Sequence, residues 1–228
     1  MGLLRARKTE ELNLPFFISL MELLKGLIFW LVELDSNDYQ DPVKLEGYPR
    51  KERQKILRET RLFDLLIDCL IYPFEFKITA YDDLTTQSPY TQICRLVYRI
   101  LKHGVQDYDG NKDYVAQWID LFFKQAMTTT ERNSFFAEKT IQELLLNNKN
   151  LLDTQINDDT ISALVNLCLT QPKHKRFLDL MANLCSCNGQ AIASNQDSIC
   201  MTILNNEKHR DNKEKMLCGV ESKNEKDP

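Results

Sequence analysis

The amino-acid sequence predicts an all-α protein, and three observations lead to that fold class. Apolar residues recur with the helical period in each apolar run, and no run shows the alternation of a half-buried strand. Only seven glycines and seven prolines occur in 228 residues, and they lie mostly between these runs. Successive amphipathic helices with short connections stack in pairs. We therefore predict an armadillo-like α-solenoid of about eight or nine helices, irregular because no strict sequence repeat is visible.

The first predicted helix covers residues 14–34, the one segment apolar enough to suggest a membrane helix. Its length suffices to span a bilayer. Glu22, Lys25 and Glu33 interrupt it, however, and on a helix they fall within one narrow arc. A helix with one thin polar stripe and a broad apolar face is typical of a packed multi-helix core. We therefore predict a core helix here and no direct membrane span.

The later helices are marked by capping and turn residues as well as by their period. Pro49 can occupy the first turn of a helix at 50–59, and Gly104 and Gly189 lie where helices should end. The segment Asn157–Asp159 offers N-cap side chains for a helix at 158–170, and Asn195 can cap the last helix. Besides 14–34, helices are expected at 50–59, 61–72, 89–103, 111–127, 131–148, 158–170, 173–186 and 196–204.

These elements divide the chain into three regions. Residues 1–47 are predicted to form an N-terminal helix and linker that belong to the helical stack, and residues 48–204 the main helical domain. Residues 205–228 are charged and nearly free of apolar side chains, which predicts a disordered tail.

Composition excludes several classes of protein. The net charge is −4 at pH 7, so the chain as a whole is not suited to binding nucleic acid, and any basic site must be local. The seven cysteines are odd in number, and most lie in apolar helical patterns. That usage indicates reduced, buried thiols in an intracellular protein rather than a disulfide framework. The N-terminus lacks the small-residue cleavage site of a signal peptide.

No motif for catalysis or for a cofactor occurs, so we expect neither an enzyme nor a bound cofactor. The glycines are too far apart for a dinucleotide-binding or phosphate-binding loop, and no G-x-S-x-G is present. His103, His174 and His209 are each expected at the surface, His103 as a cation at a helix C-terminus. Cys185 and Cys187 have no second pair of ligands at a usable spacing, so no metal site is expected.

One short stretch, YPRKERQKILRE at residues 48–59, concentrates positive charge, with five basic residues and two acidic ones. On a helix, Lys51, Lys55 and Arg58 share one face because they are spaced i, i+4, i+7. We name these three residues the basic stripe. Three cations on one face can hold several phosphate groups through charge-assisted hydrogen bonds.

The surroundings of the basic stripe leave two interpretations open. Glu52 and Glu59 are expected to lie off the stripe, and Ile56 and Leu57 to point toward the helical stack. The stripe would then have no carboxylate facing it. A phosphate site requires that absence of facing negative charge. A charged helix face is, however, more often simply solvated.

Several longer blocks resemble the helical domain shared by inositol 1,4,5-trisphosphate receptors and ryanodine receptors. The resemblance spans about residues 48–204 and keeps the order of the blocks. The first three blocks are closer to the inositol trisphosphate receptor, and LCSCNG and SNQD to the ryanodine receptor. The blocks are PRKERQKILRE with LFDLLIDCLIYPFE, YTQICRLVYRILKHGVQDYDGNKDYVAQ, LLLNNKNLLD and RFLDLMANLCSCNGQAIASNQDSIC.

The resemblance implies an armadillo-like fold and a place on the cytoplasmic face of the endoplasmic reticulum membrane, within a tetrameric calcium-release channel. The isolated chain would be cytoplasmic. In such receptors the ligand, inositol trisphosphate, binds in a cleft between a β-trefoil and this helical domain, and calcium is the transported ion. The resemblance assigns ligand binding to Lys51, Lys55, Arg58 and Tyr108. The partners it implies are the other domains and subunits of the channel.

At the second ligand cluster the sequence departs from the family. Where the family has a Tyr-Arg-Lys run after a Gln-Asp pair, this chain has Tyr108-Asp109-Gly110 after Gln106-Asp107. The tyrosine is kept, but both cations are lost, and Asp109 would face phosphate with like charge. Lys112 is the nearest later cation that could compensate.

The sequence leaves three functions open. A β-trefoil pattern and pore helices are not found, so the chain is expected to be one helical module of a channel, forming one side of the ligand cleft and relaying gating motion. A stand-alone helical module that binds a partner protein and no inositol phosphate is the alternative that Asp109 and Gly110 favour. A fragment of ryanodine receptor type is the third, and it predicts no response to inositol trisphosphate.

Overall fold

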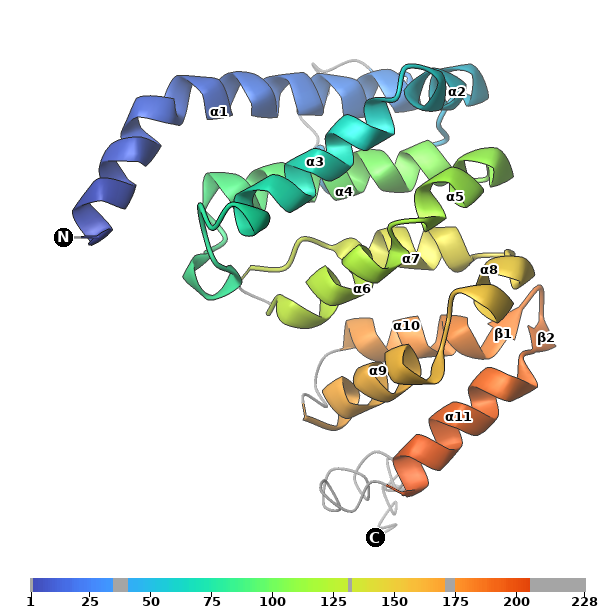
Figure 1. Cartoon of the computed structure of the whole chain (residues 1–228). Coiled ribbons are helices and arrows are strands. Elements are labelled where there is room, and N and C mark those ends of the chain that lie inside the picture. Colours follow the sequence, from blue (N-terminus) through green and yellow to red (C-terminus); the bar gives the residue numbers. More distant parts are fainter. Residues whose placement is uncertain (1, 35–40, 131–132, 171–174, 206–228) are drawn as a thin grey trace, which may run out of the picture. The chain divides into compact units, whose positions relative to one another are not determined.

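The structure, a computed structural model, describes residues 2–34, 41–130, 133–170 and 175–205, with side chains from Leu14 onward. The chain forms two compact units, Met1–Leu144 and Leu145–Pro228. Both are helical, and the described part contains eleven α-helices, a short 3-10 turn and one two-stranded hairpin (Figure 1). The prediction of an all-α, solenoid-like fold is confirmed. The predicted tail, residues 205–228, lies outside the described residues except for Asn205.

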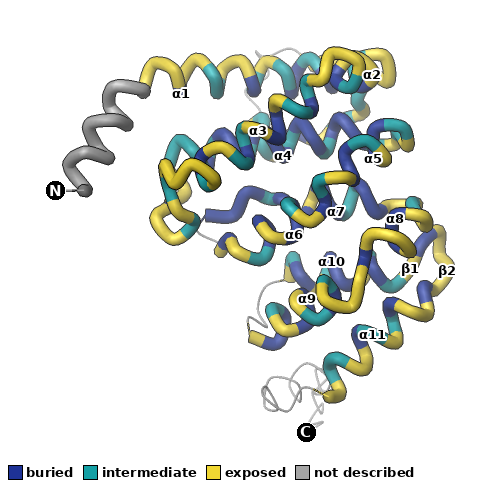
Figure 2. The backbone as a smooth tube through the Cα atoms, viewed as in Figure 1, coloured by how far each residue is buried: buried dark blue, intermediate teal, exposed yellow. Residues whose placement is uncertain are grey.

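The first unit contains the longest helix and the basic stretch. Its elements are α1 (Gly2–Val32), α2 (Lys51–Glu59), α3 (Leu62–Glu75), the 3-10 turn (Tyr81–Asp83), α4 (Pro89–Val105), α5 (Asp109–Ala116), α6 (Ile119–Thr128) and α7 (Ala137–Leu145), whose last residue begins the second unit. Helix α4 is its centre, because α1, α2, α3 and α5 all pack against it. Figure 2 shows α4 buried along most of its length.

Helix α4 is formed by the period that the sequence shows. Ile93, Leu96, Val97, Ile100 and Leu101 recur at i, i+3, i+4, i+7, i+8, and all five are buried. Pro89 stands in the first turn, where its missing N–H is not needed. The apolar period of this helix therefore predicted its core face correctly.

Helix α1 is a core helix on one face only. Phe17, Leu24, Ile28 and Leu31 are buried, and α1 packs against α4. Among the described residues, Leu14–Val32 is the one stretch long and apolar enough to cross a membrane, with 33% of it buried. Core helices of soluble proteins pass the same test of length and composition. The predicted core packing is thus present, but exposed apolar side chains remain beside the buried face.

The second unit is a smaller helical group with a core of its own. Its elements are α8 (Lys149–Thr154), α9 (Asp158–Thr170), α10 (Lys175–Cys185), β1 (Ser186–Cys187), β2 (Gln190–Ala191) and α11 (Ala193–Leu204). Helix α9 packs against both α10 and α11. The Asn157 side chain accepts a hydrogen bond from the Thr160 N–H at 2.8 Å, so the predicted N-cap of this helix is confirmed.

The structure corrects the expectation that no strand occurs. Strands β1 and β2 pair antiparallel, with Ser186 opposite Ala191 and Cys187 opposite Gln190. The two loop residues, Asn188 and Gly189, both have positive φ, 52° and 73°. That backbone is the two-residue hairpin turn for which Asn-Gly is favoured. Gly189 therefore closes a hairpin and does not simply end a helix.

Three predicted helix boundaries were also wrong. The helix expected at 111–127 is two helices, α5 and α6, separated at Gln117 and Trp118. Within the helix expected at 131–148, the described residues form α7, Ala137–Leu145. The unpredicted α8 follows it, because Asn147 has a φ of 59° and Asn148 caps α8 through the Leu151 N–H at 3.1 Å. Helix α11 begins at Ala193, so Asn195 is not its cap.

Asn195 instead lies inside the fold of the second unit. It is buried, and its side-chain amide donates to the Leu184 carbonyl at 3.0 Å. This hydrogen bond joins α11 to the last turn of α10. A short polar side chain read as a cap from sequence is here a buried tie between two helices.

Candidate functional site

The basic stripe lies on α2, a helix of nine residues. Arg50 has extended backbone, and its carbonyl accepts the Arg53 and Gln54 N–H groups at 3.0 and 2.9 Å, which starts the helix. Pro49 thus stands just outside the helix and not in its first turn. Glu52 in the first turn and Arg58 in the last turn both suit the helix dipole.

The face of α2 next to the stripe attaches the helix to the unit. Gln54 and Leu57 are buried. Ile56, expected to point toward the stack, is 44% exposed, so that prediction was wrong. The contact between α2 and the rest of the unit is narrow. Gln54 and Leu57, which are three residues apart, reach the interior, and Ile56 does not face it.

A buried polar network holds α2 against the turn between α4 and α5. The Gln54 side-chain amide donates to the His103 carbonyl at 2.7 Å and to the Gln106 carbonyl at 2.8 Å. In return, the Asn111 amide donates to the Gln54 carbonyl at 2.9 Å and to the Gly104 carbonyl at 2.8 Å. The sequence prediction missed these two side chains. The one available signal was a Gln three residues before the buried Leu57, on the same helix face.

His103 is buried, which contradicts its predicted surface position. Its Nε2–H donates to the Leu45 carbonyl at 3.0 Å, and its Nδ1 lies 3.3 Å from Gln106 Oε1. Burial lowers the pKa of His103 to about 4, and the charges of Arg99 and Lys102 contribute to that decrease. The side chain is therefore neutral near pH 7 and anchors the segment before α2. His174 and His209 lie outside the described residues.

The structure places the three basic-stripe residues together, but with a carboxylate beside them. Lys51 and Lys55 are exposed, and Arg58 is partly buried. Glu59 pairs with Lys55 at 3.4 Å, because a residue four positions later returns to the same face. The expectation that no carboxylate faces the stripe was therefore wrong. Both side chains of this pair are exposed, so the Lys55 ammonium can leave Glu59 and bind another anion.

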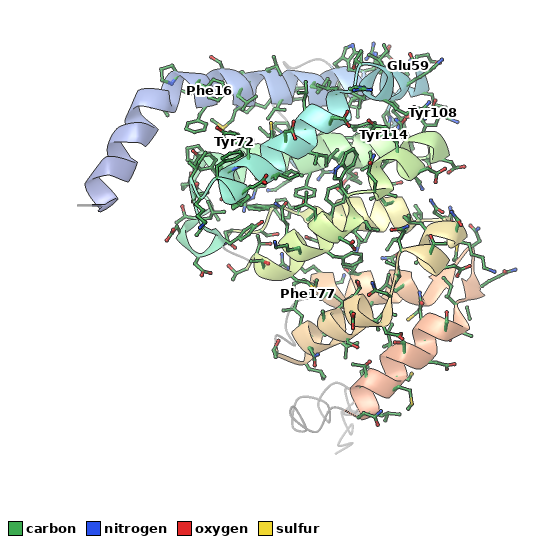
Figure 3. The ribbon with its side chains drawn as sticks, in the orientation of Figure 1. Phe16, Glu59, Tyr72, Tyr108, Tyr114 and Phe177 are labelled. Carbon is green, nitrogen blue, oxygen red and sulfur yellow. The ribbon has the colours of Figure 1, made fainter. Side chains whose placement is uncertain are left out.

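Arg58 and Tyr108 meet, although they are fifty residues apart. The Arg58 guanidinium lies over the Tyr108 ring, 5.6 Å from its centroid, in cation–π geometry. Figure 3 shows Tyr108 at the end of α5 nearest α2. Gly110 allows this approach, because a Cβ there would stand 2.5 Å from an Arg58 nitrogen. The fourth predicted site residue is thus brought to the basic stripe.

Lys112 does not replace the missing cations of the second cluster. It is buried, and its charge acts on Glu143, whose pKa burial raises. Asp109, by contrast, is exposed at the first turn of α5, where its charge suits the helix dipole. The end of the site nearest α5 therefore has the exposed carboxylate of Asp109, while Lys112 is buried.

A cavity of about 650 Å³ opens beside the start of α2. Glu33 lies in it and pairs with Arg50, and with Arg53 at 3.6 Å. Lys51 also lines the cavity, whereas Lys55 and Arg58 do not. The basic stripe is thus an open helix face with one end at a cavity. Among the residues that the structure describes, no group of three His, Cys, Asp or Glu side chains could hold a metal ion.

Comparison with known proteins identifies the family of the chain. The family model for the RIH domain (RYDR_ITPR) matches residues 21–211. The chain belongs to the RIH domain family. The matched range includes α2 and every later helix of both units, and the end of α1. The resemblance drawn from residues 48–204 is confirmed by this match.

Two curated relatives carry similar stretches. Inositol 1,4,5-trisphosphate receptor itr-1 of Caenorhabditis elegans is 27% identical over 188 residues, which cover 77% of this chain. Inositol 1,4,5-trisphosphate receptor-like protein A of Dictyostelium discoideum is 24% identical over 182 residues, which cover 79%. The RIH-domain chain spans 6% and 5% of the lengths of these relatives.

Proposed function

We propose that this RIH-domain chain acts as the cytoplasmic helical module of an intracellular calcium-release channel of inositol trisphosphate receptor type. In this proposal α2 forms one side of an inositol trisphosphate site, a β-trefoil from elsewhere in the channel forms the other, and the helices relay the gating motion. The names of the two relatives and the matched blocks support the channel context.

One observation carries the ligand site: three cations on one face of α2 meet an aromatic ring at one end. Lys51 and Arg58 are seven residues apart, which is about 10 Å along a helix. That distance suits two phosphate groups on one small ring, each held by charge-assisted hydrogen bonds. The Arg58 guanidinium already lies over the Tyr108 ring in the absence of ligand. The Arg58 side chain therefore loses less conformational entropy when the ligand binds.

The Gln54 network supports the relay. Gln54 joins α2 to α4, to α5 and to the turn between them through three hydrogen bonds of 2.7 to 2.9 Å, and Asn111 also donates to the Gly104 carbonyl of α4 at 2.8 Å. A ligand that displaces α2 would therefore move this turn with it. Small shifts of a packed element of this kind are a common way to pass a binding event to neighbouring domains.

A second candidate function is a helical interaction module that binds no inositol phosphate. Asp109 at the α5 end of the stripe and the Lys55–Glu59 pair favour it, since both place negative charge where a phosphate would bind. A module of ryanodine receptor type would give the same negative result with inositol trisphosphate.

The test is a titration of the full chain with inositol trisphosphate, followed by amide chemical shifts in NMR spectra. One side of a cleft binds weakly, and NMR detects weak binding. We expect shifts in α2 and at Tyr108, and a Kd that rises at least about tenfold in the Lys55→Glu, Arg58→Glu double variant. Lys139→Glu, an exposed lysine on α7, is the matched control and should leave the Kd unchanged.

Two results would decide against the ligand site. Shifts spread over all exposed lysines, or an equal response to inorganic sulfate, would indicate unspecific anion binding. An absence of shifts would favour the interaction module. Asp109→Asn adds a gain-of-binding arm, because it removes the like charge and should tighten binding if phosphate lies near α5.

A further inference from the structure

Helix α1 carries a second apolar row beside the row that faces α4. Phe16, Leu20, Leu23, Leu27 and Trp30 are spaced by four, three, four and three residues, so they share one flank of the helix. Phe16 and Leu23 are 64% and 66% exposed, and the other three are partly exposed. Apolar residues at this spacing are typical of a contact with another helix. None of the helices in the described unit covers Phe16 or Leu23.

Helix α3 and its C-cap carry a matching row. Leu62, Leu65, Cys69, Tyr72 and Phe76 are spaced by three, four, three and four residues. Leu65, Tyr72 and Phe76 are 55–63% exposed, and the rings of Tyr72 and Phe76 lie 4.6 Å apart. The end residues of each row are fourteen positions apart, about 21 Å along a helix.

The contacts of the two helices place both rows on the same side of the unit. Helices α1 and α3 both pack against α4. On α3, Asp64 accepts a hydrogen bond from Tyr114 of α5 at 2.7 Å, so the α5 side of α3 is taken and the row lies on the other flank. On α1, Trp30 contacts Arg53 of α2, so its row lies on the flank toward α2. Figure 3 shows Phe16 and Tyr72 at the same end of the two helices.

The charges around the rows select the kind of partner. Between Leu62 and Phe76, α3 carries Asp64, Asp68 and Glu75 and has no Lys or Arg. On α1, Glu22 and Lys25 pair at 2.7 Å and balance each other. The apolar surface therefore has an acidic border on its α3 side. Complementary charge gives specificity to helix contacts of this kind.

We propose that the exposed rows of α1 and α3 dock a basic amphipathic helix of a partner protein. That helix would run about four turns along the rows, with its apolar face on Leu23, Leu65 and Tyr72 and its basic flank toward Asp68 and Glu75. This docking surface is independent of the ligand site on α2, because it uses none of the basic-stripe residues.

The test uses the full chain and a labelled synthetic helix of about 18 residues, made of leucine and lysine with leucine on one face. Fluorescence anisotropy measures its Kd. We expect Leu23→Asn and Leu65→Asn each to raise the Kd at least about fivefold, and Asp68→Lys, Glu75→Lys together to do the same. Met201→Asn, an exposed apolar residue of the second unit, is the control and should have no effect.

Further experiments distinguish a partner helix from other molecules that could cover the rows of α1 and α3. A peptide of the same composition with scrambled order, or one with glutamate in place of lysine, should bind at least about fivefold more weakly. If these peptides bind as tightly as the leucine–lysine helix, or if the leucine–lysine helix does not bind, the proposal is overturned. Self-association of the chain that Leu23→Asn abolishes would assign the rows to a second copy. Flotation with phosphatidylcholine and phosphatidylserine vesicles that depends on Leu23 would assign them to a lipid surface, and either result overturns the partner helix.

Discussion

Gly104 shows, at the scale of one residue, how closely α2 and α3 approach α4. A Cβ at this position would stand 2.7 Å from Phe63 Cε1 and 3.1 Å from Leu57 Cδ1, and both side chains are fully buried. We expect Gly104→Ala to lower the free energy of unfolding by about 1–3 kcal/mol through overpacking. Urea unfolding followed by circular dichroism measures the change.

Gly26 is the matched control for that substitution. It lies in α1, and a Cβ at this position would meet nothing within 4 Å, so Gly26→Ala should raise the free energy of unfolding by about 0.5–1 kcal/mol. Equal effects of the two substitutions would show that helix propensity, and not packing, governs position 104.

His103 links stability to pH through its burial. Burial lowers its folded-state pKa to about 4, below the ordinary 6.5 that the unfolded chain has. Between these values the unfolded state binds one more proton, so stability is full above pH 6.5 and is lost as pH falls toward 4. The loss from pH 6.5 to 5 is about 2 kcal/mol.

The measurement is the free energy of unfolding in urea at several pH values from 5 to 7. The same series on His103→Gln, which does not titrate, is the comparison. The slope of its free energy of unfolding against pH should be smaller by the contribution of about one proton. An identical slope in both proteins would mean that His103 binds its proton over the same pH range in the folded and unfolded states, so that its contact with the Leu45 carbonyl does not require the neutral ring.

At the scale of elements, the attachment of α2 depends on hydrogen bonds more than on apolar area. Leu57 is its one buried apolar residue, whereas Gln54 makes two side-chain hydrogen bonds to α4 and the turn after it. Gln54→Met keeps the length of the side chain but leaves the His103 and Gln106 carbonyls without these donors. We expect a loss of about 1–3 kcal/mol in the free energy of unfolding.

Gln117→Met is the control for this element. Gln117 is exposed, and its amide donates only to the nearby Tyr114 carbonyl at 2.8 Å, so the change should stay within about 0.5 kcal/mol. Hydrogen exchange gives a second measurement, because Gln54→Met should speed exchange in α2 before α4. Unchanged exchange in α2 would contradict the role assigned to Gln54.

At the scale of the whole molecule, each unit has its own buried core. Trp30 and Trp118 are the two tryptophans of the chain, and both belong to the unit Met1–Leu144. Phe177 is buried in the other unit. We expect Phe177→Leu to cost about 1–2 kcal/mol and to lower the thermal midpoint seen by circular dichroism, while the midpoint seen by tryptophan fluorescence stays in place.

Leu178→Ala, at the partly exposed neighbouring position, is the control and should shift neither midpoint by more than about 2 °C. If Phe177→Leu moves both midpoints equally, the two units unfold as one cooperative body. Fluorescence alone would then report the stability of the entire chain.

The sequence by itself determined the fold class and many of the buried faces, because these depend on residues within one or two turns of each other. The period in α4, the cap at Asn157 and the alignment of Lys51, Lys55 and Arg58 are local and were predicted correctly. The Asn-Gly hairpin is local too, and its signal was overlooked. The break between α5 and α6 had no signal, since the apolar period continues through it in the sequence.

Only the tertiary structure decided what surrounds those faces. The burial of His103, its bond to the Leu45 carbonyl, and the contact of Arg58 with Tyr108 join residues 50 or more positions apart. Such contacts depend on how α2 packs against α4 and α5, which no local period encodes. For the same reason the apolar rows of α1 and α3 could be read from spacing, but their exposure could not, because burial is a property of the neighbours that packing supplies.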